Sequence, residues 1–331
     1  MEPSQVAPGR FFAGLLVATA VPVCAYALSE VVLPHHSVVA RTSLWVTFLG
    51  SSGHVAASFF FYTDRRGRAH MLANSRGRVV WAPLVVIATT SAFFAAAGSW
   101  LPYGITLYWI WQTHHYTRQN HGILSFVARA YGAPPGELER TALTLSGVGG
   151  VIGALTFVAP YRETFLADFG WHLHHIALGA YAAGWLLYLA ACFRDREARL
   201  AAHPLRTVVS TVLMLFYLPL FLFRDPMLAV GSYAMAHGLQ YLIFMGYVAA
   251  VPRADLLRRA LTLIACIVLL GMGLDFLQAA KPFGDYRMAV YGAYLGLVMW
   301  HFLLDAGVWR LSESFQRGYM AERFSFLAPG S

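Results

Sequence analysis

Ten apolar segments, each about as long as a bilayer is thick, constrain this 331-residue chain more than any other feature. A hydrocarbon core of about 30 Å needs roughly 20 apolar residues in a helix. Lipid offers no partner to the backbone, so such segments fold as helices. We therefore predict an all-α, polytopic helical bundle that forms one integral membrane domain over residues 1–331. The predicted spans are residues 11–33, 42–62, 79–100, 104–127, 141–160, 168–193, 205–223, 227–250, 256–278 and 286–308.

Composition agrees with a membrane protein. Hydrophobic residues make up 58% of the chain, charged residues only 12%, and the mean hydropathy is +0.55. Soluble domains carry about 25% charged residues, so the composition excludes an ordinary soluble domain. The formal net charge of +8 would suggest a nucleic-acid partner in a soluble protein. Here we expect no such partner, because the arginines follow a membrane topology.

Arginines are concentrated in alternate loops between the predicted spans. Basic residues favour the cytoplasmic side of a membrane, so this alternation predicts an even number of spans with both termini in the cytoplasm. The matching location is the inner, cytoplasmic membrane of a bacterium. The loops on the predicted cytoplasmic side contain Arg65, Arg66, Arg68, Arg76, Arg78, Arg129, Arg140, Arg194, Arg196, Arg199, Arg206, Arg253, Arg258 and Arg259.

Small residues within the spans indicate packing. Residues 146–150 read Ser-Gly-Val-Gly-Gly, and this mid-span run predicts the close approach of two helices. Cys24, Cys192 and Cys266 lie far apart in apolar stretches without CxxC spacing. They therefore indicate neither a disulfide framework nor a thiolate metal site.

Histidines inside the apolar segments are the strongest functional signal. An ionisable ring in hydrocarbon is costly unless it faces a cavity or a partner, so an intramembrane histidine indicates a functional site. The histidine-bearing spans are the second, fourth, sixth, eighth and tenth, which all run in the same direction. Ligands on different helices can meet at one metal only if they share a depth. The predicted boundaries place five histidines near the bilayer midplane: His54, His114, His115, His237 and His301.

Other histidines lie nearer the membrane faces. His172, His174 and His175 fall towards the outer side, and His121 towards the inner side. Helical periodicity places Asp168, His172 and His175 on one face. We expect His174 to serve helix packing. Whether Asp168, His121 and His172 belong to the site stays open.

Three polar residues near these histidines are the catalytic candidates. Asp305 follows His301 by one helical turn, and a ligating histidine usually donates its second ring N–H to such a group. Asp305 is therefore predicted either to orient His301 or to bind the metal itself. Tyr241 lines one side of its helix together with His237. Arg118 is costly at its depth, so we expect it to meet Asp305, Asp275 or an anionic substrate group.

The combination of ligand types points to iron. Neutral imidazole suits iron, copper and zinc, and imidazoles with an added carboxylate are typical of oxygen-activating non-haem iron. We predict one or two non-haem irons, with haem or copper as alternatives. A hydrogen-bonded core histidine is the competing interpretation of His54. The predicted metal ligands are His54, His114, His115, His237, His301 and His175.

The histidine pattern resembles a class of integral-membrane enzymes. His114-His115 followed by His121, His172-x-His174-His175, and the single His237 and His301 resemble the multi-histidine non-haem iron enzymes. These include fatty-acid desaturases and hydroxylases, alkane hydroxylases, and Brp/Blh-type carotenoid dioxygenases. The last group is closest in size and in its isolated intramembrane histidines. The resemblance implies iron, dioxygen and an apolar, lipid-like substrate, with an external electron donor for reactions that consume electrons.

Three functions compete at this point. The first is a membrane-embedded non-haem iron oxygenase that hydroxylates, desaturates or cleaves a C=C bond of a lipid-soluble substrate. The second is a haem-bearing electron-transfer or quinol-oxidising protein, with paired histidines as haem ligands. The third is a metal or proton transporter in which the histidines, Glu30, Asp275 and Asp305 act as relay stations. Ligands clustered at one depth favour a fixed site over a path.

Overall fold

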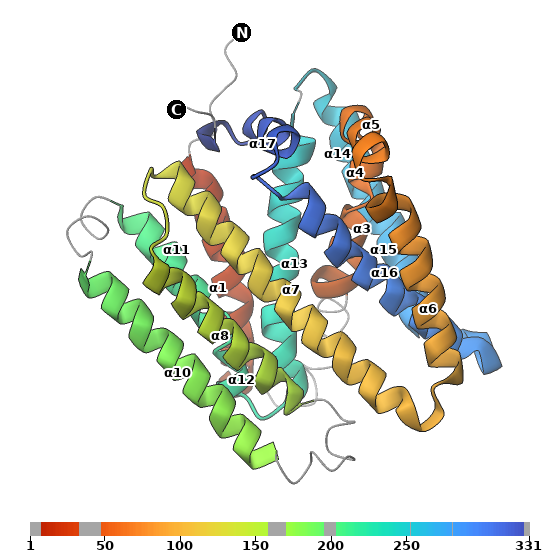
Figure 1. Ribbon diagram of the computed structural model, residues 1–331, viewed down its shortest axis with the longest axis horizontal. Coiled ribbons are helices and arrows are strands. Elements are labelled where there is room, and N and C mark those ends of the chain that lie inside the picture. Colours follow the sequence, from red (N-terminus) through yellow and green to blue (C-terminus); the bar gives the residue numbers. More distant parts are fainter. Residues whose placement is uncertain are drawn as a thin grey trace. The chain divides into compact units, whose positions relative to one another are not determined.

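The computed structural model describes residues 8–32, 48–157, 170–194, 203–251, 253–279 and 281–327, and every regular element in these ranges is helical (Figure 1). The predicted all-α fold is thus confirmed for the described part of the chain. The α-helices are α1 (Pro8–Val32), α3 (Gly53–Ala57), α4 (Phe60–Thr63), α5 (Arg65–Asn74), α6 (Ala82–Ala96), α7 (Leu101–Ala130), α8 (Glu137–Leu155), α10 (Gly170–Arg194), α11 (Pro204–Leu215), α12 (Pro219–Leu222), α13 (Pro226–Ala249), α14 (Leu256–Ala265), α15 (Gly271–Ala279), α16 (Arg287–Val308) and α17 (Ser314–Ala321).

Short π and 3₁₀ segments interrupt or extend these helices. Three of them are π-helical, namely η1 (Phe48–Ser52), η2 (Gly77–Trp81) and η7 (Cys266–Leu270). The 3₁₀ segments are η3 (Gly98–Trp100), η6 (Arg253–Asp255), η8 (Lys281–Tyr286) and η9 (Ser325–Leu327). Because of these interruptions, the described part of predicted span 42–62 consists of η1, α3 and α4 instead of one straight helix.

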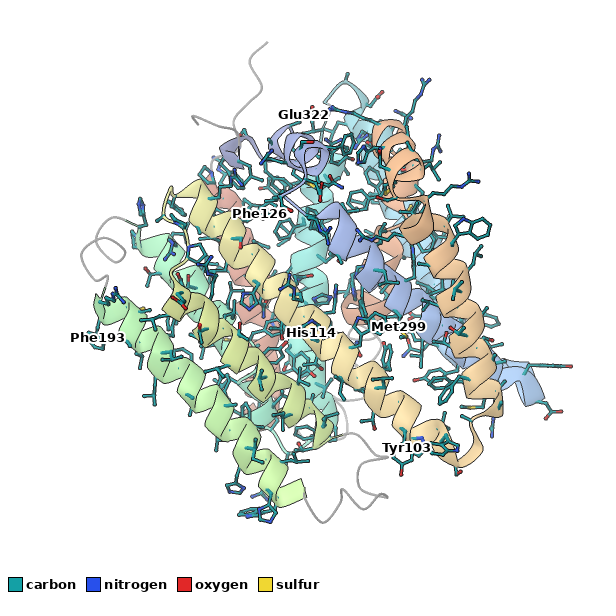
Figure 2. All side chains as sticks on the ribbon, in the orientation of Figure 1. Tyr103, His114, Phe126, Phe193, Met299 and Glu322 are labelled. Carbon is teal, nitrogen blue, oxygen red and sulfur yellow. The ribbon has the colours of Figure 1, made fainter. Side chains whose placement is uncertain are left out.

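Five helical stretches in the described ranges are long and apolar enough to cross a membrane. Large apolar side chains also cover the outward faces, as on α10, where Trp171 is 71% exposed and Phe193 77% (Figure 2). Such faces suit lipid, whereas soluble proteins rarely expose large apolar patches. The molecule is therefore a membrane-associated helical bundle. The five stretches are Pro8–Tyr26, Gly77–Ala96, Gly170–Arg194, Leu256–Ala279 and Gly284–Val308.

The chain divides into two compact units that alternate along the sequence. Unit 1 comprises Met1–Arg41, Ile105–His237 and Ser325–Ser331, and unit 2 comprises Thr42–Gly104 and Gly238–Phe324. The long helices α7 and α13 each pass from one unit into the other. A single integral membrane domain over 1–331 stays a prediction.

Glycines bring the helices of unit 1 close together. A Cβ at Gly149 would overlap the carbonyl oxygen of Ala177, so only glycine lets α8 lie against α10 at this point (Figure 1). A Cβ at Gly150 would overlap the ring of Tyr217. The Gly-rich run at 146–150 therefore serves close helix packing, as predicted.

Unit 2 uses the same device where α16 packs against α6 (Figure 1). A Cβ at Gly292 would overlap the carbonyl oxygen of Thr90. The hydroxyl of Ser91 crosses this contact and donates to the carbonyl of Ala289 at 2.9 Å. Because α6 packs closely against α16, the polar residues of α16 are held at a fixed depth within unit 2.

A buried ionic cluster closes one end of unit 2. The Asp64 carboxylate accepts hydrogen bonds from the Gly67 backbone N–H and from Arg259 Nη1, both at 2.8 Å. Arg323 Nη2 lies 3.5 Å from Asp64 Oδ2. Asp64 is 5% exposed, so its charge is shielded from water and depends on these three partners.

The Asp64 cluster predicts a specific acid sensitivity. Burial alone would raise the pKa of Asp64, but the Gly67 N–H and the two arginines outweigh it and hold the pKa below its usual range. A carboxyl group with a depressed folded-state pKa stabilises the fold fully above its unfolded pKa of about 3.9, and loses that stabilisation as pH falls through the folded value. We expect thermal stability to fall steeply below about pH 4.

Thermal unfolding of detergent-solubilised protein between pH 6 and pH 3 measures this effect. Asp64→Asn should be less stable at pH 6 and should show a shallower acid decline than wild type. Asp255→Asn is the matched control, because Asp255 pairs with Arg258 on the exposed surface. It should keep the wild-type slope, and an unchanged slope in Asp64→Asn would contradict the assignment.

Candidate functional site

Four buried polar side chains of unit 2 form a closed ring. They come from three helical regions: Ser58 is the C-cap of α3, Tyr241 lies on α13, and His301 and Asp305 lie one turn apart on α16. Ser58 Oγ lies 2.6 Å from His301 Nδ1 and 2.9 Å from the Tyr241 hydroxyl. Tyr241 donates to Asp305 Oδ1 at 2.9 Å. Asp305 Oδ2 lies 3.6 Å from His301 Nε2 and closes the ring.

Each hydroxyl of the ring donates its proton to the next member, and this order determines which ring nitrogen of His301 carries the proton. Tyr241 donates its single hydroxyl proton to Asp305 Oδ1 and has none left for Ser58. The hydroxyl of Ser58 must then donate to Tyr241, which makes Ser58 the acceptor for His301. His301 therefore carries its proton on Nδ1, and Nε2 keeps its lone pair.

The lone pair of His301 faces a second acceptor. Nε2 and Asp305 Oδ2 are 3.6 Å apart, which is too long for a hydrogen bond. Two ligand atoms that are each about 2.1 Å from one metal are separated by about 3.0–3.6 Å. One cation could therefore contact both atoms at this separation. The chemistry of this donor pair therefore fits a metal ion.

His54 adds a second imidazole to this ring. It is 2% exposed, and its ring centroid lies 5.1 Å from that of His301 and 5.9 Å from that of Tyr241. The π-helix η1 directly precedes α3 and sets the position of His54, and π segments are frequent at functional sites. A Cβ at Gly238 would overlap the Leu49 carbonyl oxygen of η1, so α13 reaches this region only through a glycine.

Aromatic side chains surround the ring on the side of Asp305. The ring of Trp309 lies 5.2 Å from Phe244, 6.1 Å from Phe61 and 6.4 Å from Tyr241, measured between centroids. These edge-to-face contacts build an aromatic wall beside Tyr241. Two residues of this site, Ser58 and Trp309, were not among the predicted site residues. For Ser58 the available signal was its position one helical turn after His54.

Unit 1 contains its own histidine pair. The ring centroids of His115 and His237 lie 5.1 Å apart, and the ring of Tyr116 lies 4.1 Å from that of His237. Gln119 donates to the backbone carbonyl of His237 at 3.2 Å. Both histidines are buried, and Tyr233 extends the aromatic wall beside Tyr116. The pair is therefore largely shielded from solvent.

Three other predicted site residues, His114, Arg118 and His175, lie on exposed helix faces outside the ring. His114 (labelled in Figure 2) and Arg118 share an exposed stripe of α7. His175 is also exposed, and its Nδ1 donates to the carbonyl of Trp171 at 2.7 Å. His121 Nε2 lies 3.2 Å from the hydroxyl of Thr144. The functional roles of these residues stay predictions, as does the pairing of Arg118 with a carboxylate.

The remaining histidines of the outer group are His172 and His174. His172 is exposed and His174 is half-buried, with its ring 6.0 Å from that of Phe221. Contact with an aromatic neighbour agrees with the packing role expected for His174. Asp168 lies outside the described residues.

Comparison with known proteins adds no assignment. No protein-family model, curated protein or solved structure matches this chain.

Proposed function

We propose that the protein is a membrane-embedded non-haem iron oxygenase that hydroxylates, desaturates or cleaves a C=C bond of an apolar, lipid-like substrate with dioxygen. One observation carries the proposal: the hydrogen-bonded ring presents His301 Nε2 to Asp305 Oδ2 at 3.6 Å, beside the buried His54. Two imidazoles and a carboxylate are typical ligands of oxygen-activating non-haem iron.

Each residue of the ring has a separate role in this proposal. His301 and Asp305 would hold the metal, His54 would add an imidazole beside His301, and iron would supply the one-electron and dioxygen chemistry. Ser58 fixes the tautomer of His301, and Tyr241 orients Asp305 by donating to Oδ1. Trp309 packs against Tyr241 and helps to hold its ring in place. Such supporting hydrogen bonds raise metal affinity because they hold the ligands in place before the metal binds.

Where two irons are bound, the proposal places the second at the His115–His237 pair of unit 1. Both rings are buried, and the Tyr116 ring packs against His237. The ring does not include the exposed His114, His175 or Arg118, whose functional roles stay predictions. A hydroxylation or desaturation would draw electrons from an external donor, whereas a dioxygenation needs none.

We further propose ten membrane spans with both termini in the cytoplasm, in the inner membrane of a bacterium. Helices lie in all ten predicted segments, and five of these segments contain a described stretch long and apolar enough to cross a membrane. The alternation of arginine-rich and arginine-poor loops supports this orientation. A lipid-like substrate would then reach the site from within the bilayer.

Metal analysis together with a visible spectrum tests the function. Detergent-purified wild type should contain one or two non-haem irons per chain and show no Soret band. His301→Ala and His54→Ala should lose the iron of unit 2. Ser58→Ala should keep the ligands but bind that iron about 10–100-fold more weakly.

His203→Ala is the matched control, because His203 is not a predicted ligand and its ring packs against Tyr131 at a centroid distance of 5.2 Å. It should retain the full iron content. A Soret band in wild type would assign the protein to the haem class instead. Wild type without bound metal after gentle purification would contradict the oxygenase proposal, and transport in proteoliposomes would then be measured.

A further inference from the structure

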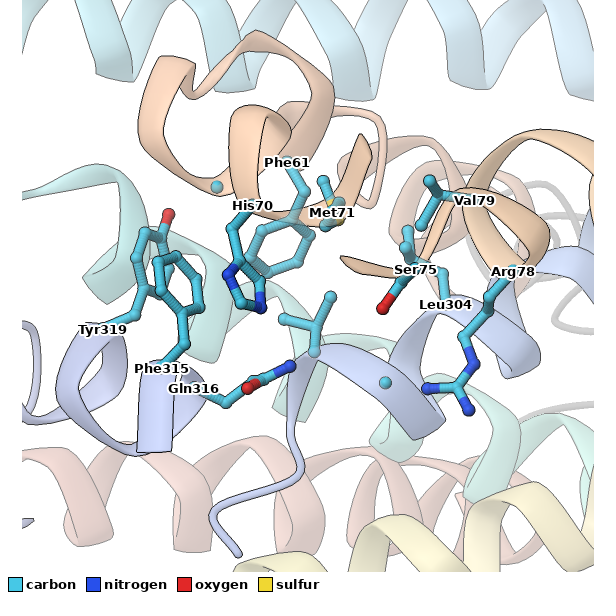
Figure 3. Close-up of a pocket in the computed structure, with 13 residues that line it drawn as sticks. Phe61, His70, Met71, Ser75, Arg78, Val79, Leu304, Phe315, Gln316 and Tyr319 are labelled. Atoms are coloured by element: carbon cyan, nitrogen blue, oxygen red, sulfur yellow. The ribbon is translucent and has the colours of Figure 1, made fainter. Parts of the chain in front are cut away.

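A groove of about 560 Å³ in unit 2 has an unusual concentration of arginines. It lies where the start of η2, the end of α16 and the start of α17 meet. Arg76, Arg78 and Arg310 line it, with Ser75 and Ser314 between them. We call it the arginine groove. Figure 3 shows an adjoining, mainly apolar pocket that shares Ser75 and Arg78 with it.

The positive charge of the groove is largely uncompensated. Glu313 is the one carboxylate among the lining residues, and it lies 3.8 Å from Arg310 in an exposed pair. Within the described ranges, neither Arg76 nor Arg78 forms an ion pair. Arginine binds phosphate through two parallel N–H bonds, so these side chains suit a phosphate group.

Packing directs Arg78 into the groove. The side chain is half-buried against α16, and a Cβ at Gly307 would come within 2.7 Å of Arg78 Nη1. Glycine at this position therefore lets the guanidinium lie across the end of α16. A guanidinium held in this way loses less side-chain entropy when it binds an anion.

The first turn of α17 adds hydrogen-bond donors to the same groove. Ser314, Phe315 and Gln316 all line it. The first N–H groups of a helix have no acceptor within the helix and favour an anion. The ring of His70 on α5 stacks on Phe315 at a centroid distance of 3.6 Å, which anchors this turn.

An apolar surface continues directly from the groove. On the helix formed by η2 and α6, Trp81, Leu84 and Val85 follow Arg78, and each is more than half exposed. This helix is one of the five candidate membrane spans. An acyl chain lying along α6 would place its headgroup beside Arg78. Tryptophan favours the headgroup level of a bilayer.

We propose that the arginine groove binds the phosphate of an anionic lipid headgroup. The proposal is independent of the metal and of the oxygenase function. Free phosphate or a soluble phosphate ester shares the same chemistry, and the experiment separates the two sources.

Native mass spectrometry of the purified full-length protein measures binding. The probes are phosphatidylglycerol, phosphatidylcholine and glycerol 3-phosphate at matched concentrations. Phosphatidylglycerol should bind at least about tenfold more tightly than the other two, because only it combines a net negative headgroup with acyl chains. Equal binding of the two lipids would overturn the proposal. Glycerol 3-phosphate binding as tightly as phosphatidylglycerol would overturn the lipid source.

Variants locate the binding site. Arg78→Gln should weaken phosphatidylglycerol binding about tenfold, and so should Arg76→Gln, which changes an exposed side chain. Gly307→Ala should weaken it as well, although it removes no charge. Arg65→Gln is the matched control, because Arg65 is exposed on α5 outside the groove. Wild-type affinity in Arg76→Gln and Arg78→Gln, or an equal loss in Arg65→Gln, would overturn the assignment.

Discussion

Arg206→Met is expected to lower the free energy of unfolding by about 3–5 kcal/mol. Arg206 Nη2 donates to Glu139 Oε2 at 2.9 Å, and the two side chains are only 2% and 3% exposed. The hydroxyl of Ser210 donates to Glu139 Oε1 at 3.1 Å, and Arg206 Nε donates to the carbonyl of Ala133 at 3.2 Å. Removing the guanidinium alone takes this countercharge away from the buried Glu139 carboxylate.

Urea titration of the detergent-solubilised protein measures this loss. The double variant Arg206→Met/Glu139→Gln should recover most of the stability, because it removes both buried charges together. Arg66→Met is the matched control. It breaks an exposed pair with Glu322, whose side chains are 58% and 47% exposed, and such pairs contribute about 0–1 kcal/mol. Equal losses in Arg206→Met and Arg66→Met would contradict the expected cost of burial.

Asp305→Asn is expected to weaken iron binding by about 100-fold or more. Asparagine keeps the size of the side chain and an oxygen that accepts from Tyr241, but it removes the negative charge opposite His301 Nε2. Tyr241→Phe keeps the carboxylate and removes only the hydroxyl that orients it. Loss of such an orienting group typically costs about 10–100-fold in metal affinity.

Iron titration of the apoprotein, followed by its visible spectrum, gives both affinities without knowledge of the substrate. Tyr294→Phe is the matched control for Tyr241→Phe. Tyr294 is a buried tyrosine on α16 whose hydroxyl lies 2.7 Å from Ser51, outside the ring. Its loss should leave iron affinity unchanged. Wild-type affinity in Asp305→Asn would show that the carboxylate is not a ligand.

Periodicity predicts neighbours on one helix and not which face is buried. His114 and His115 were predicted together as ligands, yet His115 is buried and His114 exposed. Adjacent residues on a helix point about 100° apart, so the two rings could not share one environment. Only the packing of α7 determines which of them faces the protein interior.

The arginines also show that a sequence pattern does not predict which side chains are buried. Arg206 and Arg259 were assigned to basic loops because of their sign and spacing, but both are buried in ion pairs. Their partners Glu139 and Asp64 lie 67 and 195 residues away. Sequence spacing carries no information about contacts at such separations.

The amino-acid sequence by itself determined the all-helical fold, the glycine-mediated packing at residues 146–150, and the proximity of His301 to Asp305. Each of these follows from local physics: backbone hydrogen bonding in an apolar segment, the size of glycine, and 3.6 residues per turn. Only the tertiary structure joined Ser58 and Tyr241 to His301 and Asp305 and thereby assigned the tautomer of His301. That ring spans up to 247 residues of chain between Ser58 and Asp305, and packing of whole helices decides which distant side chains meet.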